Sequence, residues 1–332
     1  MNGAAGESTA VVRRLTGEMV EGERKVSTDH ANLSIAVGER YIVKWFHTPA
    51  AHASFDVVEH LAAVGFPHMP RFVGVVDDGG SVVATVSELV PGVTDGWQWY
   101  VADVIGWVDG AGDLDGLVRT AARMGSITAE LHDALAGDSA IRGSLDPARA
   151  WVRDRRRVAV EQTTGEAGDR LRARLRQVDA ALGVLDSTDD VTVQRIHGDL
   201  HAGQFLRSSD DPARRLLLTD FDGDPLAAPG RRPDLEPVER DVASLLQSID
   251  HVGRIAARRR GGADVTEFVD AGIDAALEAY QSARRLDRSL LFALRVAQEL
   301  HEYAYAATRL PIWGYVPDAA LVALFPDEDG AR

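Results

Sequence analysis

Short apolar runs separated by polar turns characterise the first 90 residues of the chain. The run over residues 41–46 is β-branched and aromatic almost throughout, which predicts a strand. Further strands are predicted at residues 11–20, 33–37, 71–76 and 82–86, the last two joined as a hairpin by an Asp-Asp-Gly-Gly turn. Apolar residues at helical spacing over residues 51–64 predict one amphipathic helix. The first part of the chain is therefore expected to be rich in β-structure.

The pattern changes to helical spacing after residue 92. Apolar positions recur at helical intervals over residues 97–108, 114–135, 147–161, 167–185, 242–257 and 289–309. The segment Ser87-Glu-Leu-Val-Pro-Gly92 interrupts the strand pattern and marks the boundary between the two regions. We therefore expect an α+β protein with an N-terminal lobe over residues 1–90 and a mainly helical C-terminal lobe over residues 91–332.

Two loops carry carboxylates directly after predicted strands. One loop follows residues 191–193 and contains Asp199, and the other follows residues 216–218 and contains Asp220. Phosphoryl transfer needs one carboxylate to orient the acceptor hydroxyl and further oxygen ligands to hold Mg²⁺ against the phosphates. Asp199 suits the first task, and Asp220 with the amide of Gln204 suits the second.

The two loops together resemble the catalytic segments of protein kinases, in which Asp-x-x-x-x-Asn is followed by Asp-Phe-Gly. The form His197-Gly-Asp-x-His201 is similar in particular to the aminoglycoside phosphotransferase and maltokinase superfamily. This resemblance implies a bilobal protein-kinase-like fold, the use of ATP with Mg²⁺, and Asp199 as the catalytic residue. It also implies that Gln204, Asp220 and Asp222 hold the metal, with Asp222 replacing the usual glycine.

The same resemblance assigns nucleotide-binding residues to the N-terminal lobe. Lys44, one of only two lysines in the chain, has the position of the lysine that holds the α- and β-phosphates. Glu59 on the predicted helix is the candidate partner of Lys44. Backbone groups near Glu88 and Val90 are expected to hydrogen-bond the adenine edge. The Arg-Asp pair at 240–241 is expected to tie the start of a helix to the catalytic loop.

The predicted helix over residues 289–309 has one face that changes from apolar to polar. Leu291 and Leu294 begin a stripe that continues, at helical spacing, through Gln298, His301, Glu302 and Tyr305. Because burying an unpaired carboxylate in a solid core is costly, we expect this face to line a wet cleft. A satisfied polar core or a partly exposed helix end is the alternative.

The polar stripe suggests how a sugar substrate is bound. Glu302 is suited to pair with an ammonium group, and the other three polar side chains of the stripe are suited to bind hydroxyls. Trp313 offers an aromatic face for the sugar ring, and His201 is a further candidate contact. The segment over residues 298–321 resembles the C-terminal signature of bacterial glucosamine kinases, which are relatives of maltokinase.

This second resemblance implies ATP-dependent phosphorylation of the 6-hydroxyl of D-glucosamine, an amino sugar. Three alternatives remain open at this point: a maltokinase, an aminoglycoside antibiotic phosphotransferase, and a non-catalytic pseudokinase that serves as a binding module.

Composition narrows the range of partners. The formal net charge of −15 argues against nucleic acid or an anionic membrane surface and suits a neutral or cationic small molecule. The chain has no cysteine, which excludes disulfides and thiolate metal sites but leaves oxygen-ligated Mg²⁺ available. No apolar run is long enough to span a bilayer and the N-terminal residues lack a signal-peptide pattern, so a cytoplasmic location is expected.

Overall fold

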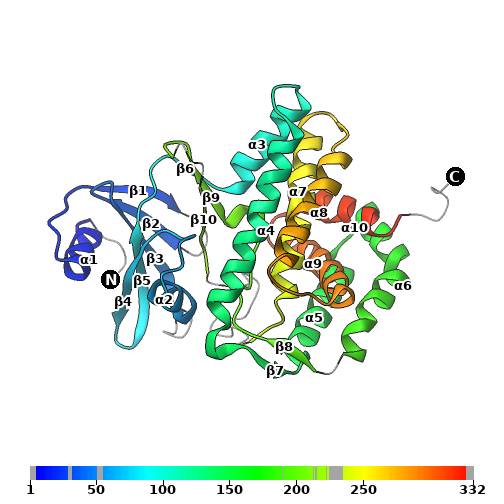
Figure 1. Cartoon of the computed structure of the whole chain (residues 1–332), viewed down its shortest axis with the longest axis horizontal. Helices are drawn as coiled ribbons and strands as arrows, with labels where there is room; N and C mark the ends of the chain where they lie inside the picture. Colours follow the sequence, from blue (N-terminus) through cyan, green and yellow to red (C-terminus); the bar gives the residue numbers. More distant parts are fainter. Residues whose placement is uncertain are drawn as a thin grey trace. The chain divides into compact units, whose positions relative to one another are not determined.

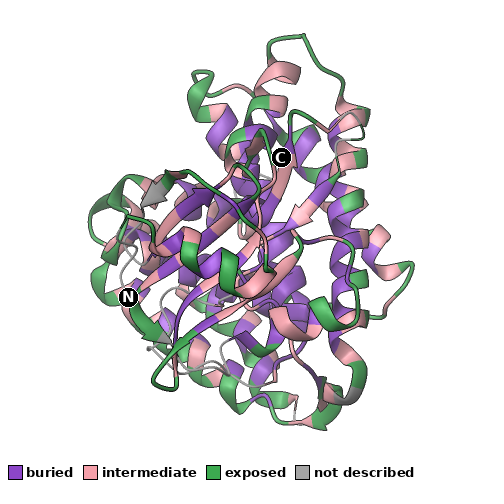
Figure 2. Cartoon of the chain, turned by 90° about the vertical axis from the view of Figure 1, so that its left-hand side faces the viewer, coloured by how far each residue is buried: buried purple, intermediate pink, exposed green. Residues whose placement is uncertain are grey.

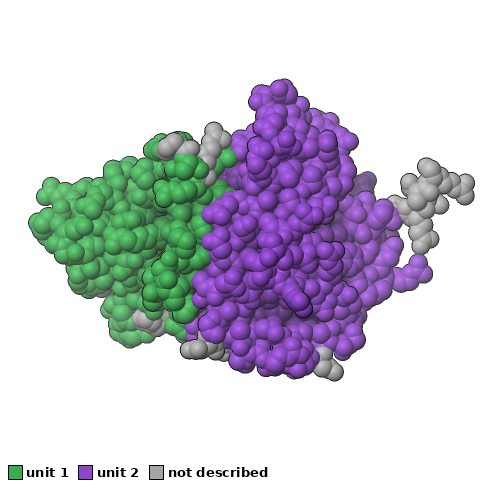
Figure 3. All heavy atoms as spheres, viewed as in Figure 1, with its two compact units in different colours: residues 1–95, 204–232 green, residues 96–203, 233–332 purple. Residues whose placement is uncertain are grey.

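The computed structural model describes residues 5–28, 32–50, 55–188, 190–211, 213, 215–221, 223 and 235–326. The chain divides into two compact units, shown in different colours in Figure 3. The first unit contains residues 1–95 and 204–232, and the second contains residues 96–203 and 233–332. The first division lies five residues after the predicted boundary at residue 90, and residues 204–232 return to the first unit.

The first unit is built on a five-stranded antiparallel sheet with strand order β1-β2-β3-β5-β4. Its strands are β1 (Glu23–Thr28), β2 (Asn32–Val37), β3 (Tyr41–Ala50), β4 (Phe72–Asp78) and β5 (Ser81–Glu88). The strands predicted at residues 33–37, 41–46, 71–76 and 82–86 are therefore confirmed. Figure 2 shows buried residues on strands of this sheet, and β2, β3 and β5 contribute most of them.

The strand predicted at residues 11–20 is wrong, because these residues contribute to helix α1 (Glu7–Thr16), which ends at Gly17 in the left-handed conformation. Two adjacent β-branched residues, Val11 and Val12, favoured the strand interpretation. In the structure both are buried, and with Leu15 they form one helical face that packs against the core of the sheet. Tertiary packing therefore overrides the local strand preference here.

Helix α2 (Asp56–Ala63) confirms the helix predicted over residues 51–64, of which residues 51–54 lie outside the described part of the chain. A second, three-stranded sheet completes the first unit, with β10 (Leu216–Leu218), β9 (Phe205–Ser208) and β6 (Val93–Thr94) in this order. Leu218 donates a backbone hydrogen bond of 2.6 Å to the carbonyl of His68. The end of β10, directly before Thr219 and Asp220, is thus tied to the segment between α2 and β4.

The second unit is mainly helical (Figure 1). Its α-helices in the described residues are α3 (Gly96–Val108), α4 (Leu114–Ala136), α5 (Asp146–Gln162), α6 (Gly165–Ser187), α7 (Glu239–Arg259), α8 (Thr266–Gln281), α9 (Arg288–Thr308) and α10 (Tyr315–Leu324). Strands β7 (Ile141–Gly143) and β8 (Val191–Val193) pair antiparallel, and short 3₁₀ helices occur at Gly137–Ser139, Ala202–Gln204 and Pro311–Gly314. All six helices predicted after residue 92 are confirmed, whereas α8 and α10 were not predicted.

Helix α8 was not predicted from the sequence, because small residues form part of its buried face. Gly272 and Ala276 are buried there and give only a weak apolar pattern. They allow α8 to approach α4 so closely that a Cβ atom at Gly125 would lie 2.1 Å from the carbonyl oxygen of Ala276. The contact between these helices therefore depends on backbone proximity rather than on large side chains.

Helix α7 is buried along most of its length and contacts α3, α4, α8, α9 and α10. Its buried residues include the polar side chains Asp241, Gln247, Ser248 and His251. Buried polar groups need hydrogen-bond partners, so the surroundings of α7 must supply them. Among the described residues, no helix is both long and apolar enough to cross a membrane.

Candidate active site

The loop that bears the predicted catalytic residue Asp199 lies in the second unit and is held by a buried carboxylate. Asp241, at the start of α7, accepts backbone hydrogen bonds from His197 at 2.7 Å and Gly198 at 2.9 Å, which confirms its predicted anchoring role. His132 of α4 contacts the same carboxylate at 3.1 Å. Burial opposes the charge of Asp241, but the interaction with His132 and the loop contacts together lower its pKa. The loop that bears Asp199 is thus fixed by the fold itself.

Asp199 and His201 lie close together on this loop. Their side chains are 18% and 24% exposed, and His201 Nε2 is 3.9 Å from Asp199 Oδ2. The ring of Trp97, from the first turn of α3, lies 5.2 Å from the ring of His201. A Cβ atom at Gly203 would fall 2.3 Å from Trp97 Nε1, so only glycine leaves room for this tryptophan. Trp97 therefore packs closely against this loop beside Asp199.

The polar stripe of α9 reaches Trp97 through Trp313. The indole Nε1 of Trp313 donates to Glu302 Oε2 at 2.8 Å, and Gln298 donates to Glu302 Oε1 at 3.1 Å. Trp313 also contacts Trp97 edge to face, with ring centroids 5.6 Å apart. The structure thus brings Gln298, Glu302 and Trp313, three of the predicted sugar-binding residues, together and connects them through Trp97 to the loop that bears Asp199.

The neighbours of Glu302 favour the charged form of its carboxylate. Burial by itself would raise its pKa, but the histidines His251, His301 and His201 and the hydrogen bond from Trp313 lower it. In Tyr305, which is half-buried, burial together with the carboxylates of Glu302 and Asp199 raises the pKa of the phenol. Tyr305 therefore interacts electrostatically both with Glu302, the predicted ammonium-binding residue, and with Asp199, the predicted catalytic residue.

His301 has a different environment from the rest of the stripe. It is buried, and its ring stacks on Trp151 of α5 with centroids 5.6 Å apart. The guanidinium of Arg240 lies over the same tryptophan at 4.4 Å from the ring centroid. His301 therefore packs between α9 and α5, where its charge influences Glu302.

In the first unit, Lys44 and Asp220 form an ion pair. Lys44 lies on the central strand β3, and its Nζ is 2.6 Å from Asp220 Oδ1, with side-chain exposures of 25% and 44%. Asp220 follows β10 and has a left-handed backbone with φ 64°. Such a conformation is unusual for a residue other than glycine and is common at functional sites. Glu59 lies on α2 in the same unit, and its pairing with Lys44 stays a prediction.

Oxygen donors suited to a hard cation occur beside this ion pair. The backbone N–H of Thr219 donates to the carbonyl of Gln204 at 3.1 Å, which places Gln204 beside the residue preceding Asp220. A carboxylate and an amide oxygen are donors that Mg²⁺ accepts, so these residues fit the ion. Asp222, the third predicted ligand, lies outside the described residues. Within the described residues, no group of three Asp, Glu, His or Cys side chains is arranged for metal binding.

The predicted adenine-binding segment follows β5. Glu88 is the last residue of this strand, and its backbone N–H donates to the carbonyl of Arg71 at 2.8 Å. Its carboxylate accepts a hydrogen bond of 2.7 Å from Arg71 Nε. Leu89 donates to the carbonyl of Arg40 at 2.9 Å, and Val90 follows it directly.

Three residues next to the candidate sugar site were not predicted from the sequence: Trp97, His251 and Glu299. Trp97 belongs to no motif, and its position depends on contacts with residues more than 100 positions away. His251 and Glu299 lie on predicted helices but face each other across the interior. Polar residues within the apolar pattern of residues 242–257 were the available signal for His251.

The family model described as "Phosphotransferase enzyme family" matches residues 23–222. The chain belongs to this family, which confirms the prediction of a phosphotransferase with an aminoglycoside phosphotransferase-like fold.

Within this class, the chain is similar to proteins named glucosamine kinase. The protein from Streptacidiphilus jiangxiensis is 34% identical over 348 aligned positions, covering 98% of this chain and 78% of the relative. The protein from Mycolicibacterium smegmatis is 36% identical, covering 93% of this chain and 81% of the relative.

Solved structures show the same similarity. A glucosamine kinase in complex with glucosamine, ADP and inorganic phosphate superposes with a TM-score of 0.84 at 31% identity, covering 97% of this chain and 84% of the other. Spectinomycin phosphotransferase superposes with a TM-score of 0.56 at 12% identity, covering 96% and 92% of the respective chains, which shows the shared fold alone.

Proposed function

We propose that this protein is an ATP-dependent sugar kinase that transfers the γ-phosphoryl group of ATP to the 6-hydroxyl of D-glucosamine. The observation that carries the proposal is the Glu302 carboxylate, which Gln298 and Trp313 hold by hydrogen bonds in the same unit as Asp199. A half-buried carboxylate whose neighbours lower its pKa suits a cationic amino sugar better than a neutral one. The full-length similarity to proteins named glucosamine kinase supports this choice.

Asp199 would orient the acceptor hydroxyl and accept its proton during transfer. Its loop is fixed through Asp241, so the carboxylate is positioned before the substrate binds. His201, 3.9 Å from Asp199, would contact the sugar beside the reacting hydroxyl. The result of the reaction is a phosphate ester on the sugar and ADP.

The sugar would be held by the polar stripe and by aromatic rings. Glu302 would pair with the ammonium, and Gln298 and Tyr305 would bind hydroxyl groups. The ring of Trp313 would contact the apolar face of the sugar, supported by Trp97. His301 is also a predicted sugar contact, and its stacking on Trp151 suits an electrostatic contribution behind Glu302.

Nucleotide binding would fall to the first unit. Lys44 would hold the α- and β-phosphates, with Glu59 near it on α2, and the hinge residues Glu88 and Val90 would offer backbone groups to adenine. The N–H of Glu88 donates to the carbonyl of Arg71 at 2.8 Å, so a contact of this residue with adenine would use its carbonyl.

Metal binding would involve Gln204, Asp220 and Asp222. When bound there, Mg²⁺ would neutralise phosphate charge during transfer. Lys44 holds Asp220 in place in the ion pair of 2.6 Å.

The decisive experiment is a coupled ADP-release assay with ATP and Mg²⁺ against glucosamine, glucose, N-acetylglucosamine, maltose and kanamycin in parallel. We expect a strong preference for glucosamine, and ³¹P–¹H correlation NMR of the product would show the phosphate on carbon 6. Preferred turnover of maltose or kanamycin would replace the proposed substrate with that of a maltokinase or an antibiotic phosphotransferase. No turnover of any of the five would favour a pseudokinase.

A further inference from the structure

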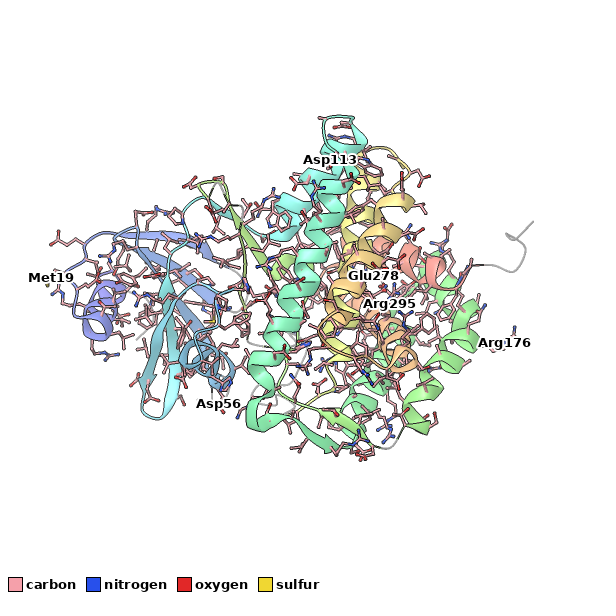
Figure 4. The ribbon with its side chains drawn as sticks, viewed as in Figure 1. Met19, Asp56, Asp113, Arg176, Glu278 and Arg295 are labelled. Atoms are coloured by element: carbon pink, nitrogen blue, oxygen red, sulfur yellow. The ribbon has the colours of Figure 1, made fainter. Side chains whose placement is uncertain are left out.

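A buried polar network lies between α7 and α9, next to Glu302. His251 Nε2 is 2.9 Å from Glu299 Oε1, and Gln247 Nε2 donates to the same oxygen at 2.5 Å. Arg295, labelled on α9 in Figure 4, donates from Nε to Gln247 Oε1 at 2.6 Å. Glu299 and His251 are 0% and 2% exposed, so this network has almost no access to solvent.

The network reaches the candidate sugar site through His251. Its imidazole meets the ring of Trp313 edge to face, with centroids 6.1 Å apart, and Trp313 donates to Glu302 at 2.8 Å. Burial disfavours the charge of His251, but the carboxylates of Glu299, Glu302 and Asp250 raise its pKa to about 9. At neutral pH the imidazole is therefore a cation beside two carboxylates.

Three carboxylates act on the charge of His251, and their other contacts decide which of them is available to a ligand. Asp250 is paired with Arg254 at 2.9 Å, which leaves Glu299 and Glu302 as the acids that share the imidazolium. Glu299 makes the direct contact with His251 and is fully buried. Burial raises the pKa of Glu299, and the direct contact with His251 opposes this rise and favours the charged carboxylate. In this pair the two charges compensate each other, so the further negative charge is that of Glu302.

We infer that Glu299 and His251 are positioning residues for amine specificity: Glu299 retains the imidazolium, so that the charge of Glu302 stays available to the substrate ammonium. This inference rests on the proposed function, because it explains how that site distinguishes an amino sugar from a neutral sugar. The buried carboxylate of Glu299 and the half-buried one of Glu302, with no cation between them, would instead favour uptake of a proton.

The inference predicts that one substitution in this network lowers the preference for glucosamine and that a second substitution restores it. Glu299→Gln removes the partner of His251, and the imidazolium then pairs with Glu302 and competes with the substrate ammonium. The added substitution His251→Gln removes the competing cation, and the two amides can still hydrogen-bond each other. The second substitution should therefore restore the preference for glucosamine that the first one reduces. If the first substitution acted only by damaging the packing, the second would reduce the preference further.

The test measures kcat/KM for glucosamine and for glucose in the ADP-release assay. For Glu299→Gln we expect the glucosamine-to-glucose ratio to fall by about tenfold or more, mainly through KM for glucosamine. In the double variant we expect the ratio to return to within about threefold of wild type. Glu278→Gln, the same change at an exposed position of α8 labelled in Figure 4, serves as the matched control.

An unchanged ratio in Glu299→Gln, or a further fall in the double variant, would overturn the inference while leaving the proposed function intact. If the wild-type enzyme showed no preference for glucosamine over glucose, both the proposed function and this inference would be refuted. Because Glu299→Gln carries a risk of misfolding, ¹⁵N-histidine NMR of the wild-type protein gives a second measurement. We expect His251 to stay protonated at about pH 7.5 when glucosamine binds, and its deprotonation on binding would contradict the inference.

Discussion

The substitution Glu302→Gln tests the proposed ammonium contact most directly. Glutamine keeps the size of the side chain and an oxygen that can accept from Trp313, which now donates to Glu302 Oε2 at 2.8 Å. What the variant loses is the negative charge, which neighbouring histidines stabilise in the wild-type protein. A change in substrate preference would therefore report on charge rather than on packing.

The size of the effect follows from the environment of the carboxylate. Two unit charges about 4 Å apart interact by roughly 4 kcal/mol at the effective dielectric constant typical of protein sites. Desolvation of the ammonium and the remaining hydrogen bond to glutamine reduce the net loss to about 2–3 kcal/mol. This loss corresponds to a decrease of about 30- to 150-fold in kcat/KM for glucosamine.

The assay compares glucosamine with glucose, which has a hydroxyl in place of the amine. We expect kcat/KM for glucose to change by less than about threefold, because the neutral hydroxyl can hydrogen-bond to either side chain. Thermal unfolding of the variant serves as the control for folding. Equal losses on both sugars in a folded variant would refute the ammonium assignment.

Three further predictions concern catalysis, packing and pH. Asp199→Asn should lower kcat by about 10²-fold or more with a small change in KM, measured by ADP release, since the amide cannot accept the proton. Gly203→Ala should displace Trp97, because a Cβ atom would lie 2.3 Å from its Nε1, and should lower the melting temperature and raise KM for glucosamine. The raised pKa of His251, about 9, contributes stability that is complete below its ordinary value of about 6.5 and is lost as pH rises through 9. Urea unfolding should therefore show a loss approaching about 3 kcal/mol across this window, and the loss should be much smaller in His251→Gln.

The sequence predicted those parts of the site that local motifs encode. Asp199 and Asp220 follow short strands in fixed spacing, so their neighbourhood could be interpreted without tertiary information. Glu302 was predicted because helical spacing places it on the same stripe as Gln298, and the two side chains are hydrogen-bonded in the structure. Helical periodicity and motif spacing are patterns over a few residues of sequence, so they were sufficient to single out these three residues.

Parts of the fold and site that depend on distant contacts could not be predicted. The two valines of α1 favour a strand locally, and only packing against the sheet makes this segment a buried helix face. Trp97 reaches the site because Gly203, more than 100 residues later, leaves space for its indole. The contact between His251 and Glu299 likewise joins two helices that the sequence predicted separately.

Helix α7 contacts both the loop that bears the predicted catalytic residue and the surroundings of the proposed amine-binding residue. Asp241 and Ser248 are seven residues apart and therefore lie on the same face of the helix. Asp241 anchors the backbone of the catalytic loop, and Ser248 accepts a hydrogen bond of 2.8 Å from Ala202 of the same loop. His251, less than one turn further, pairs with Glu299 and contacts Trp313. A shift of α7 would therefore disturb Asp199 and the surroundings of Glu302 together, so the proposed positioning of the acceptor hydroxyl and the proposed recognition of the amine depend on the same helix.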